Sequence, residues 1–142
     1  MRLCGAAVVC VLVCALAEGQ NAPPPHITVY GTPNLNACNR SLTSLQYELR
    51  RLPYPRDWQV MLVCSETAWQ SVVKSADVTN TQTAFTVRVR KLTVVNAAIF
   101  RKMRSFYRRT LSHEVGHVVC DCSSEDRAES IGNQYRHLDP GE

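Results

Sequence analysis

Hydrophobic and polar residues in the first half of the chain follow patterns that predict strands separated by helices. Residues 26–30 alternate and are rich in β-branched and aromatic side chains, as strands are. Leucines recur at partly helical spacing over residues 39–52, and Pro53 ends that segment. The apolar run 57–64 fits a central strand, and residues 67–75 fit a short helix. The pattern therefore predicts the order strand, helix, strand, helix.

Residues 81–95 predict a further strand with one buried and one solvent-facing side, because successive side chains of a strand point to opposite faces. Residues 92–95 extend it after a turn or a bulge, and Asn96 breaks the apolar run. The alternating positions are Phe85, Val87 and Val89 on one side and Thr86, Arg88 and Arg90 on the other.

A basic and aromatic segment, residues 101–109, leads into an apolar helix over residues 110–120. We expect its arginines to lie on the solvated side of a helix, with Met103, Phe106 and Tyr107 turned inward, and we expect no nucleic-acid site there. Four apolar residues of the second part share one arc of a helical wheel: Leu111, Val115, Val118 and Val119.

Within this apolar helix, His113, Glu114 and His117 form the pattern H-E-x-x-H. Residues four apart lie one above the other on a helix, so the two imidazoles can bind one metal ion. Glu114 then lies beside that ion, where its carboxylate can take a proton from water whose pKa a zinc ion lowers to about 7. The motif predicts a zinc site with Glu114 as the catalytic base.

A catalytic zinc needs a third protein ligand and one open position. Ser123 or Ser124 can cap a second helix, on which Glu125 and Glu129 share one face. We predict Glu125 as the third ligand and Glu129 as an acceptor that holds a histidine N–H. Other residues stay open as ligands: Asp121, Asp126 and His137.

Residues 113–117 (HEVGH) followed by residues 125–129 (EDRAE) resemble the gluzincin branch of zinc metallopeptidases, in which H-E-x-x-H is joined by a glutamate on the next helix, often within E-x-x-A-D. Glu129 stands where that family more often has Asp, and the link between the helices is short. The metzincin pattern does not fit, because Cys120 and Ser123 occupy its glycine and third-histidine positions.

This resemblance implies a small α+β, zincin-like domain with a three- to four-stranded N-terminal sheet and a packed helix, followed by an active-site helix and a C-terminal helix. It implies Zn²⁺ as cofactor and a peptide or protein as substrate, with endopeptidase rather than exopeptidase activity. It also implies that the strand before the active-site helix forms the sheet edge that holds an extended substrate. The alternative function is an exported, non-catalytic binding domain with a structural zinc site, closed by a fourth ligand such as His137, Cys120 or Cys122.

Residues 1–17 are predicted to be a cleaved secretory signal, with Arg2 before the apolar run 3–16 and Ala17 at the end of a small-x-small cleavage site. The apolar run is too short to span a bilayer comfortably, so we expect no stable membrane anchor. Residues 18–25 then form a Pro-rich lead-in to one domain, residues 26–142. The protein is expected to be secreted, periplasmic or extracellular.

Cleavage of the signal leaves four of the seven cysteines, and an even number in an exported protein favours disulfides. We favour a bridge between Cys38 and Cys64. A bridge between Cys120 and Cys122 would close a very small ring, and the Cys120 thiolate is an alternative metal ligand.

Overall fold

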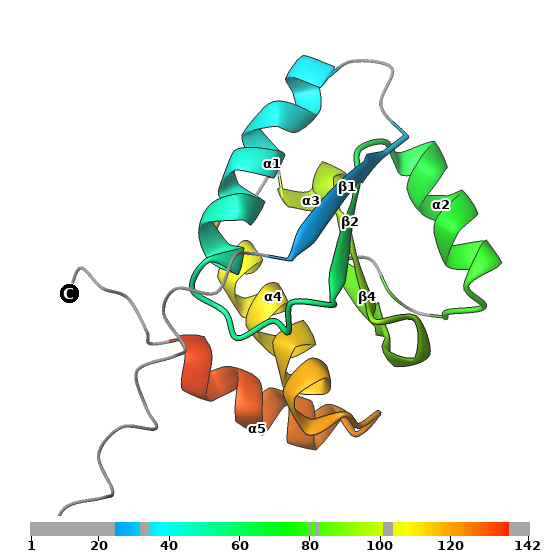
Figure 1. Ribbon diagram of the computed structural model, residues 1–142. Coiled ribbons are helices and arrows are strands. Elements are labelled where there is room, and N and C mark those ends of the chain that lie inside the picture. Colours follow the sequence, from blue (N-terminus) through cyan, green and yellow to red (C-terminus); the bar gives the residue numbers. More distant parts are fainter. Residues whose placement is uncertain (1–24, 32–34, 80, 82, 101–103, 137–142) are drawn as a thin grey trace, which may run out of the picture.

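A four-stranded mixed sheet forms the centre of the fold, and helices cover both of its faces (Figure 1). The computed structural model describes residues 25–31, 35–79, 81, 83–100 and 104–136. Outside the described part lie the predicted signal, Met103, the side chains of Phe106 and Tyr107, and His137.

The strands run in the order β1-β2-β4-β3 across the sheet. The first three in this order are parallel, and β3 pairs antiparallel with β4 at one edge. The α+β expectation is confirmed, with four strands and a C-terminal helix. The strands are β1 (His26–Tyr30), β2 (Gln59–Val63), β3 (Ala84–Val87) and β4 (Leu92–Asn96).

The predicted helices appear in the expected order with shifted ends, and a short helix over residues 97–100 was not predicted. The first begins four residues earlier than its leucine pattern indicates, and the chain leaves it well before Pro53. The short second helix is confirmed, and Ser65 caps it by accepting a hydrogen bond from the Ala68 N–H at 3.2 Å. The helices are α1 (Leu35–Leu49), α2 (Glu66–Ser75), α3 (Ala97–Phe100), α4 (Arg104–Cys120) and α5 (Glu125–Arg136).

The turn or bulge expected before residue 92 is confirmed, but the strand before it is shorter than predicted. It ends at Val87, a 3₁₀ turn occupies residues 88–90, and β4 then returns beside β3. Lys91 makes this return possible by adopting a left-handed conformation with φ of 49°, and its ammonium pairs with Asp57. Val89, predicted to be buried, is therefore 95% exposed at the tip of the turn.

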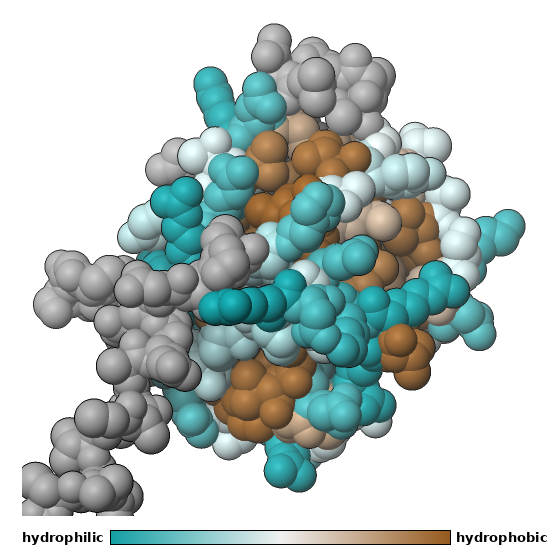
Figure 2. Space-filling view, in the orientation of Figure 1, coloured by the Kyte–Doolittle hydropathy of each residue, from teal (hydrophilic) through white to brown (hydrophobic). Residues whose placement is uncertain are grey.

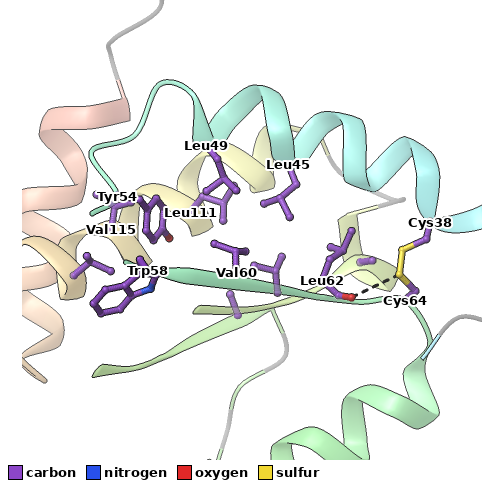
Figure 3. Packing of buried hydrophobic residues seen from close by; sticks show 14 residues of the cluster. Cys38, Leu45, Leu49, Tyr54, Trp58, Val60, Leu62, Cys64, Leu111 and Val115 are labelled. Atoms are coloured by element: carbon purple, nitrogen blue, oxygen red, sulfur yellow. Dashed lines mark hydrogen bonds between the residues drawn. A yellow bond between two sulfur atoms is a disulfide. The ribbon is translucent and has the colours of Figure 1, made fainter. Parts of the chain in front are cut away.

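Two apolar clusters hold the layers together. Leu45 of α1 and Leu111 of α4 pack with Val60 of β2 on one face of the sheet (Figure 3). On the other face, Trp69 of α2 packs against Phe85 of β3, with their ring centroids 5.7 Å apart. The sheet is thus covered by α1 and α4 on one side and by α2 on the other.

The predicted apolar arc of α4 is largely correct, since Leu111, Val115 and Val118 are buried, whereas Val119 is 45% exposed. On the face of the molecule shown in Figure 2, hydrophobic residues form several separate patches, and hydrophilic residues lie between them. Among the residues that the structure describes, no helix has the length and apolar character needed to cross a membrane.

The favoured disulfide joins Cys38 in the first turns of α1 to Cys64 at the end of β2, with Cα atoms 5.7 Å apart. A second bridge links Cys120 and Cys122, whose Cα atoms are 5.1 Å apart. This second bridge lies in the turn between α4 and α5. Both cysteine pairs are therefore within bridging geometry.

Helices α4 and α5 touch backbone to backbone at two glycines. A Cβ atom at Gly116 would collide with the Ala128 backbone of α5, and a Cβ at Gly132 would lie 2.5 Å from the Ser112 carbonyl oxygen of α4. Since both positions lack side chains, the two helix axes approach closely. This contact fixes the first turns of α5 beside residues 112–117.

We expect Gly116→Ala to destabilise the fold by about 1–3 kcal/mol, because the added methyl group overpacks the contact with Ala128. On an open helix the same change would stabilise by about 1 kcal/mol, so the sign of the effect is diagnostic. Urea unfolding measures it, with Ser130→Ala on the exposed side of α5 as control. A Gly116→Ala variant as stable as the parent would contradict the backbone contact.

Candidate metal centre and catalytic carboxylate

His113 and His117 lie one turn apart on α4, where the helical spacing placed them. Their ring centroids are 4.9 Å apart, and the rings are nearly perpendicular. The His113 side chain is 24% exposed and the His117 side chain 11%, so both are partly shielded but open on one side. The pair can therefore present two nitrogen atoms to one point.

The Glu125 carboxylate lies at that point. Its Oε2 is 2.9 Å from Nε2 of His113, and its Oε1 is 3.5 Å from Nε2 of His117. The ligand atoms of the three residues all lie within 4.8 Å of one another. The structure thus brings together the three residues predicted as metal ligands.

The other nitrogen of each imidazole meets an acceptor. His113 Nδ1 lies 3.0 Å from Oε2 of Glu129, and His117 Nδ1 lies 3.0 Å from the carbonyl oxygen of Cys122. A carboxylate and a carbonyl only accept hydrogen bonds, so both Nδ1 atoms carry the proton. In the neutral imidazoles each Nε2 then presents a lone pair toward Glu125.

Each contact between Nε2 and Glu125 can be completed by a proton on Nε2 or by a metal ion. Two imidazole lone pairs facing carboxylate oxygens repel one another unless a proton or a metal ion lies between them. Two nitrogens and one carboxylate oxygen, with each imidazole held through its far nitrogen, form a donor set that suits a divalent metal ion. The residues present therefore fit a metal ion.

Glu129 is itself held in place. Arg136 donates from Nη2 to both of its carboxylate oxygens, at 2.7 and 2.8 Å. The same guanidinium donates from Nε to the Ser112 hydroxyl at 3.2 Å. These hydrogen bonds from Arg136, followed by that from His113, lower the pKa of Glu129. Glu129 is thus an ionised acceptor where the sequence predicted one.

The turn between α4 and α5 determines where Glu125 lies. Asp121 ends α4 in a left-handed conformation with φ of 46°, and Arg88 donates to the Asp121 carbonyl oxygen at 2.6 Å. Ser124 then caps α5, because its hydroxyl accepts from the Arg127 N–H at 3.4 Å. Glu125 therefore occupies the first position of α5, where the helix dipole favours a carboxylate.

Glu114 is buried, with only 6% of its surface exposed. Burial raises the pKa of its carboxyl, and the hydrogen bond from Thr86 opposes that rise. The Thr86 hydroxyl, from β3, donates to Oε2 of Glu114 at 2.7 Å. The predicted base thus lies between the metal-ligand group and the edge strand, in a shielded position.

A pocket of about 450 Å³ opens at this place. One wall consists of β3 and the segment before it, including Thr81, Thr83 and Thr86, and the opposite wall includes His113 and Glu125. Since β3 is the last strand of the sheet, the pocket follows an edge of the sheet. An extended chain bound there would pass over the group of candidate ligands.

Among the described residues, the others considered as ligands do not join this group through their side chains. Asp121 pairs with Arg88, and Cys120 and Cys122 bridge each other. Asp126 is exposed and lies outside the group of candidate ligands, which within the described residues consists of His113, His117 and Glu125. His137 lies outside the described part of the chain.

Two residues that contact the site were not predicted from the sequence: Thr86, which binds Glu114, and Arg136, which binds Glu129. The alternating pattern placed Thr86 on the solvent-facing side of the predicted strand. The spacing of Glu129 and Arg136, two turns apart on one helix, was the available signal for their pairing.

Comparison of the chain with protein-family models, with curated proteins and with solved structures finds no match.

We predict that Glu129→Gln changes the pH dependence of stability of the metal-free protein. The pKa of Glu129 lies below its usual value of 4.5 in the folded state, so its ionised form stabilises the fold above that value. This contribution is lost as the pH falls below 4.5 toward the lowered pKa. Urea unfolding from about pH 7 to about pH 3 should show wild type losing stability more steeply than the variant.

Arg136→Ala is the matched control, because Arg136 is the main cause of the lowered pKa. Adding Glu129→Gln to this variant should produce a smaller pH-dependent difference than in wild type. A gap between wild type and Glu129→Gln that stays constant with pH would contradict the assignment.

Proposed function

We propose that this protein is a zinc-dependent metallopeptidase. The observation that carries the proposal is the position of Glu114, a buried carboxylate that lines the same pocket as the convergent group of His113, His117 and Glu125. A metal-binding group supports many functions, but a shielded carboxylate beside it is what water activation requires. The proposal includes the gluzincin kinship that the two motifs indicate.

Zinc suits the donor set better than harder cations do. Calcium and magnesium prefer ligands that are all oxygen, whereas imidazole nitrogens are common zinc ligands. Within the described residues the group supplies three donors, which is the number that a catalytic zinc would take from the protein, whereas a structural zinc would take four.

The chain's own residues have separate roles in the proposed reaction. His113, His117 and Glu125 would hold the zinc ion, which would supply a lowered pKa for the attacking water and polarisation of the scissile carbonyl. Glu114 accepts the proton of the attacking water and transfers it to the leaving amine. Glu129 and the Cys122 carbonyl keep the two imidazoles oriented throughout, because they hold the Nδ1 protons.

The proposed substrate is an extended peptide segment of a peptide or protein. Among the described strands, β3 pairs only with β4, so its other side can add a substrate strand through main-chain hydrogen bonds. The pocket extends along the segment before β3 as well as past the candidate ligands. Binding of chain on both sides of the reacting bond supports endopeptidase activity. Because residues 1–17 are predicted to be a secretory signal, we propose that this activity acts outside the cytoplasm.

The metal part of the proposal predicts one tightly bound zinc per chain. Calorimetric titration of metal-free protein measures this stoichiometry. His117→Ala should abolish tight binding, and Glu129→Gln should weaken it by about ten- to a hundredfold through the loss of its ionised contact with His113. Asp126→Asn, an exposed neighbour outside the group, is the control. Equal affinities for all three variants would refute the proposed ligand set.

The catalytic part predicts that zinc-loaded protein cleaves a mixed peptide library. Glu114→Gln keeps the size of the side chain but removes the base, so kcat should fall about a hundredfold or more while one zinc stays bound. Mass spectrometry of the library identifies the cleaved bonds. If neither protein cleaves any peptide with zinc bound in both, the exported binding domain becomes the better description.

A further inference from the structure

A line of hydrogen bonds runs from the buried core to the carboxylate of Glu114. Trp58 Nε1 donates to the Thr93 hydroxyl at 3.1 Å, and the hydroxyls of Thr93 and Thr86 are 3.1 Å apart. Thr86 in turn donates to Oε2 of Glu114 at 2.7 Å. The Tyr54 hydroxyl also donates to Thr93, at 3.5 Å. These five side chains come from the loop before β2, from β3, β4 and α4.

The chemistry of the groups fixes the direction of this line. An indole N–H can only donate, so Thr93 accepts from Trp58 and, with its second lone pair, from Tyr54. The proton of Thr93 is then directed to Thr86. Thr86 accepts that bond and directs its own proton to Glu114. Each hydroxyl thus has one defined orientation, and successive bonds in one direction strengthen one another.

The line is also rigid. Thr93 is fully buried, and the side chains that donate to it, Trp58 and Tyr54, are 7% and 6% exposed. Thr86 and Thr93 are direct cross-strand partners in the β3–β4 pair, so the sheet sets the separation of their hydroxyls. Close packing leaves these groups little room for other rotamers.

We propose that Thr86 and Thr93 are positioning residues: they hold the catalytic carboxylate of Glu114 in one orientation and act on the reaction only through it. Thr86 holds Oε2 of Glu114, and no other hydrogen bond to this carboxylate comes from the described residues. Oε1 is therefore the oxygen that serves as base toward the pocket. Thr93, which does not touch Glu114, acts by preventing the Thr86 hydroxyl from turning away. This assignment rests on the proposed peptidase function.

The test compares two substitutions at Thr93 in the full zinc-loaded protein. Thr93→Val keeps the shape of the side chain but removes the hydroxyl, and Thr93→Ser keeps the hydroxyl but removes a methyl group. We expect kcat to fall about two- to tenfold in Thr93→Val, with KM and zinc affinity unchanged, and to stay near wild type in Thr93→Ser. A purely structural role predicts instead that kcat is unchanged in both at temperatures where both are folded.

Thr93→Val leaves the Trp58 N–H without an acceptor, so this variant could fail to fold. A second pair of variants, at Thr86, keeps the test decisive in that case. Thr86→Val should lower kcat about tenfold or more, and Thr86→Ser should restore it. If kcat in Thr86→Val equals that in Thr86→Ser, the positioning role is refuted.

Crystal structures of wild type and Thr93→Val give a readout that does not depend on activity. We expect one Glu114 conformer in wild type and more than one in Thr93→Val. A single, unchanged conformer in both overturns the inference, whatever the activity. If wild type cleaves no peptide but Glu114 shows the expected conformers in the two structures, the proposed function is refuted and the positioning role of Thr93 is supported.

Discussion

The close approach of α4 and α5 is the constraint on which the candidate site depends. Gly116 and Gly132 remove the side chains that would hold the two helices apart, and each lies against the backbone of the other helix. Only at this distance can short acidic side chains on α5 reach imidazoles on α4, because a glutamate extends only a few ångströms from its backbone. A larger residue at either glycine would move Glu125 and Glu129 away from His113 together.

Sequence reasoning succeeded where the geometry is local. The four-residue spacing of His113 and His117, and that of Glu125 and Glu129, fixes which face of a helix each pair shares, without any knowledge of the fold. The sheet, the second helix and the favoured disulfide were likewise predicted from local patterns and cysteine number. The roles of the site residues as ligands and base stay predictions, although the structure places them together.

The remaining parts depend on long-range pairing, which no local pattern encodes. Thr86 reaches Glu114 only because β3 turns back on β4 at the sheet edge, and residues 88–91 contain no glycine, proline or asparagine that would mark where the turn begins. Lys91 makes the turn instead, in a left-handed conformation that is uncommon for lysine. The alternating pattern therefore extended the predicted strand to Val89 and Arg90, and the expected turn begins earlier, after Val87.

The division of the site between local and distant contacts has a consequence for how it is assembled during folding. The contacts of His113 with Glu125 and Glu129 span 12 and 16 residues, whereas Thr86 and Glu114 are 28 residues apart and Trp58 and Thr93 are 35 apart. Closing a longer loop costs more chain entropy, and contacts close in sequence form faster. Under the proposed function, the helical hairpin would therefore offer its ligands to a metal ion before the sheet supplies the threonines beside Glu114, and metal binding would precede catalytic competence.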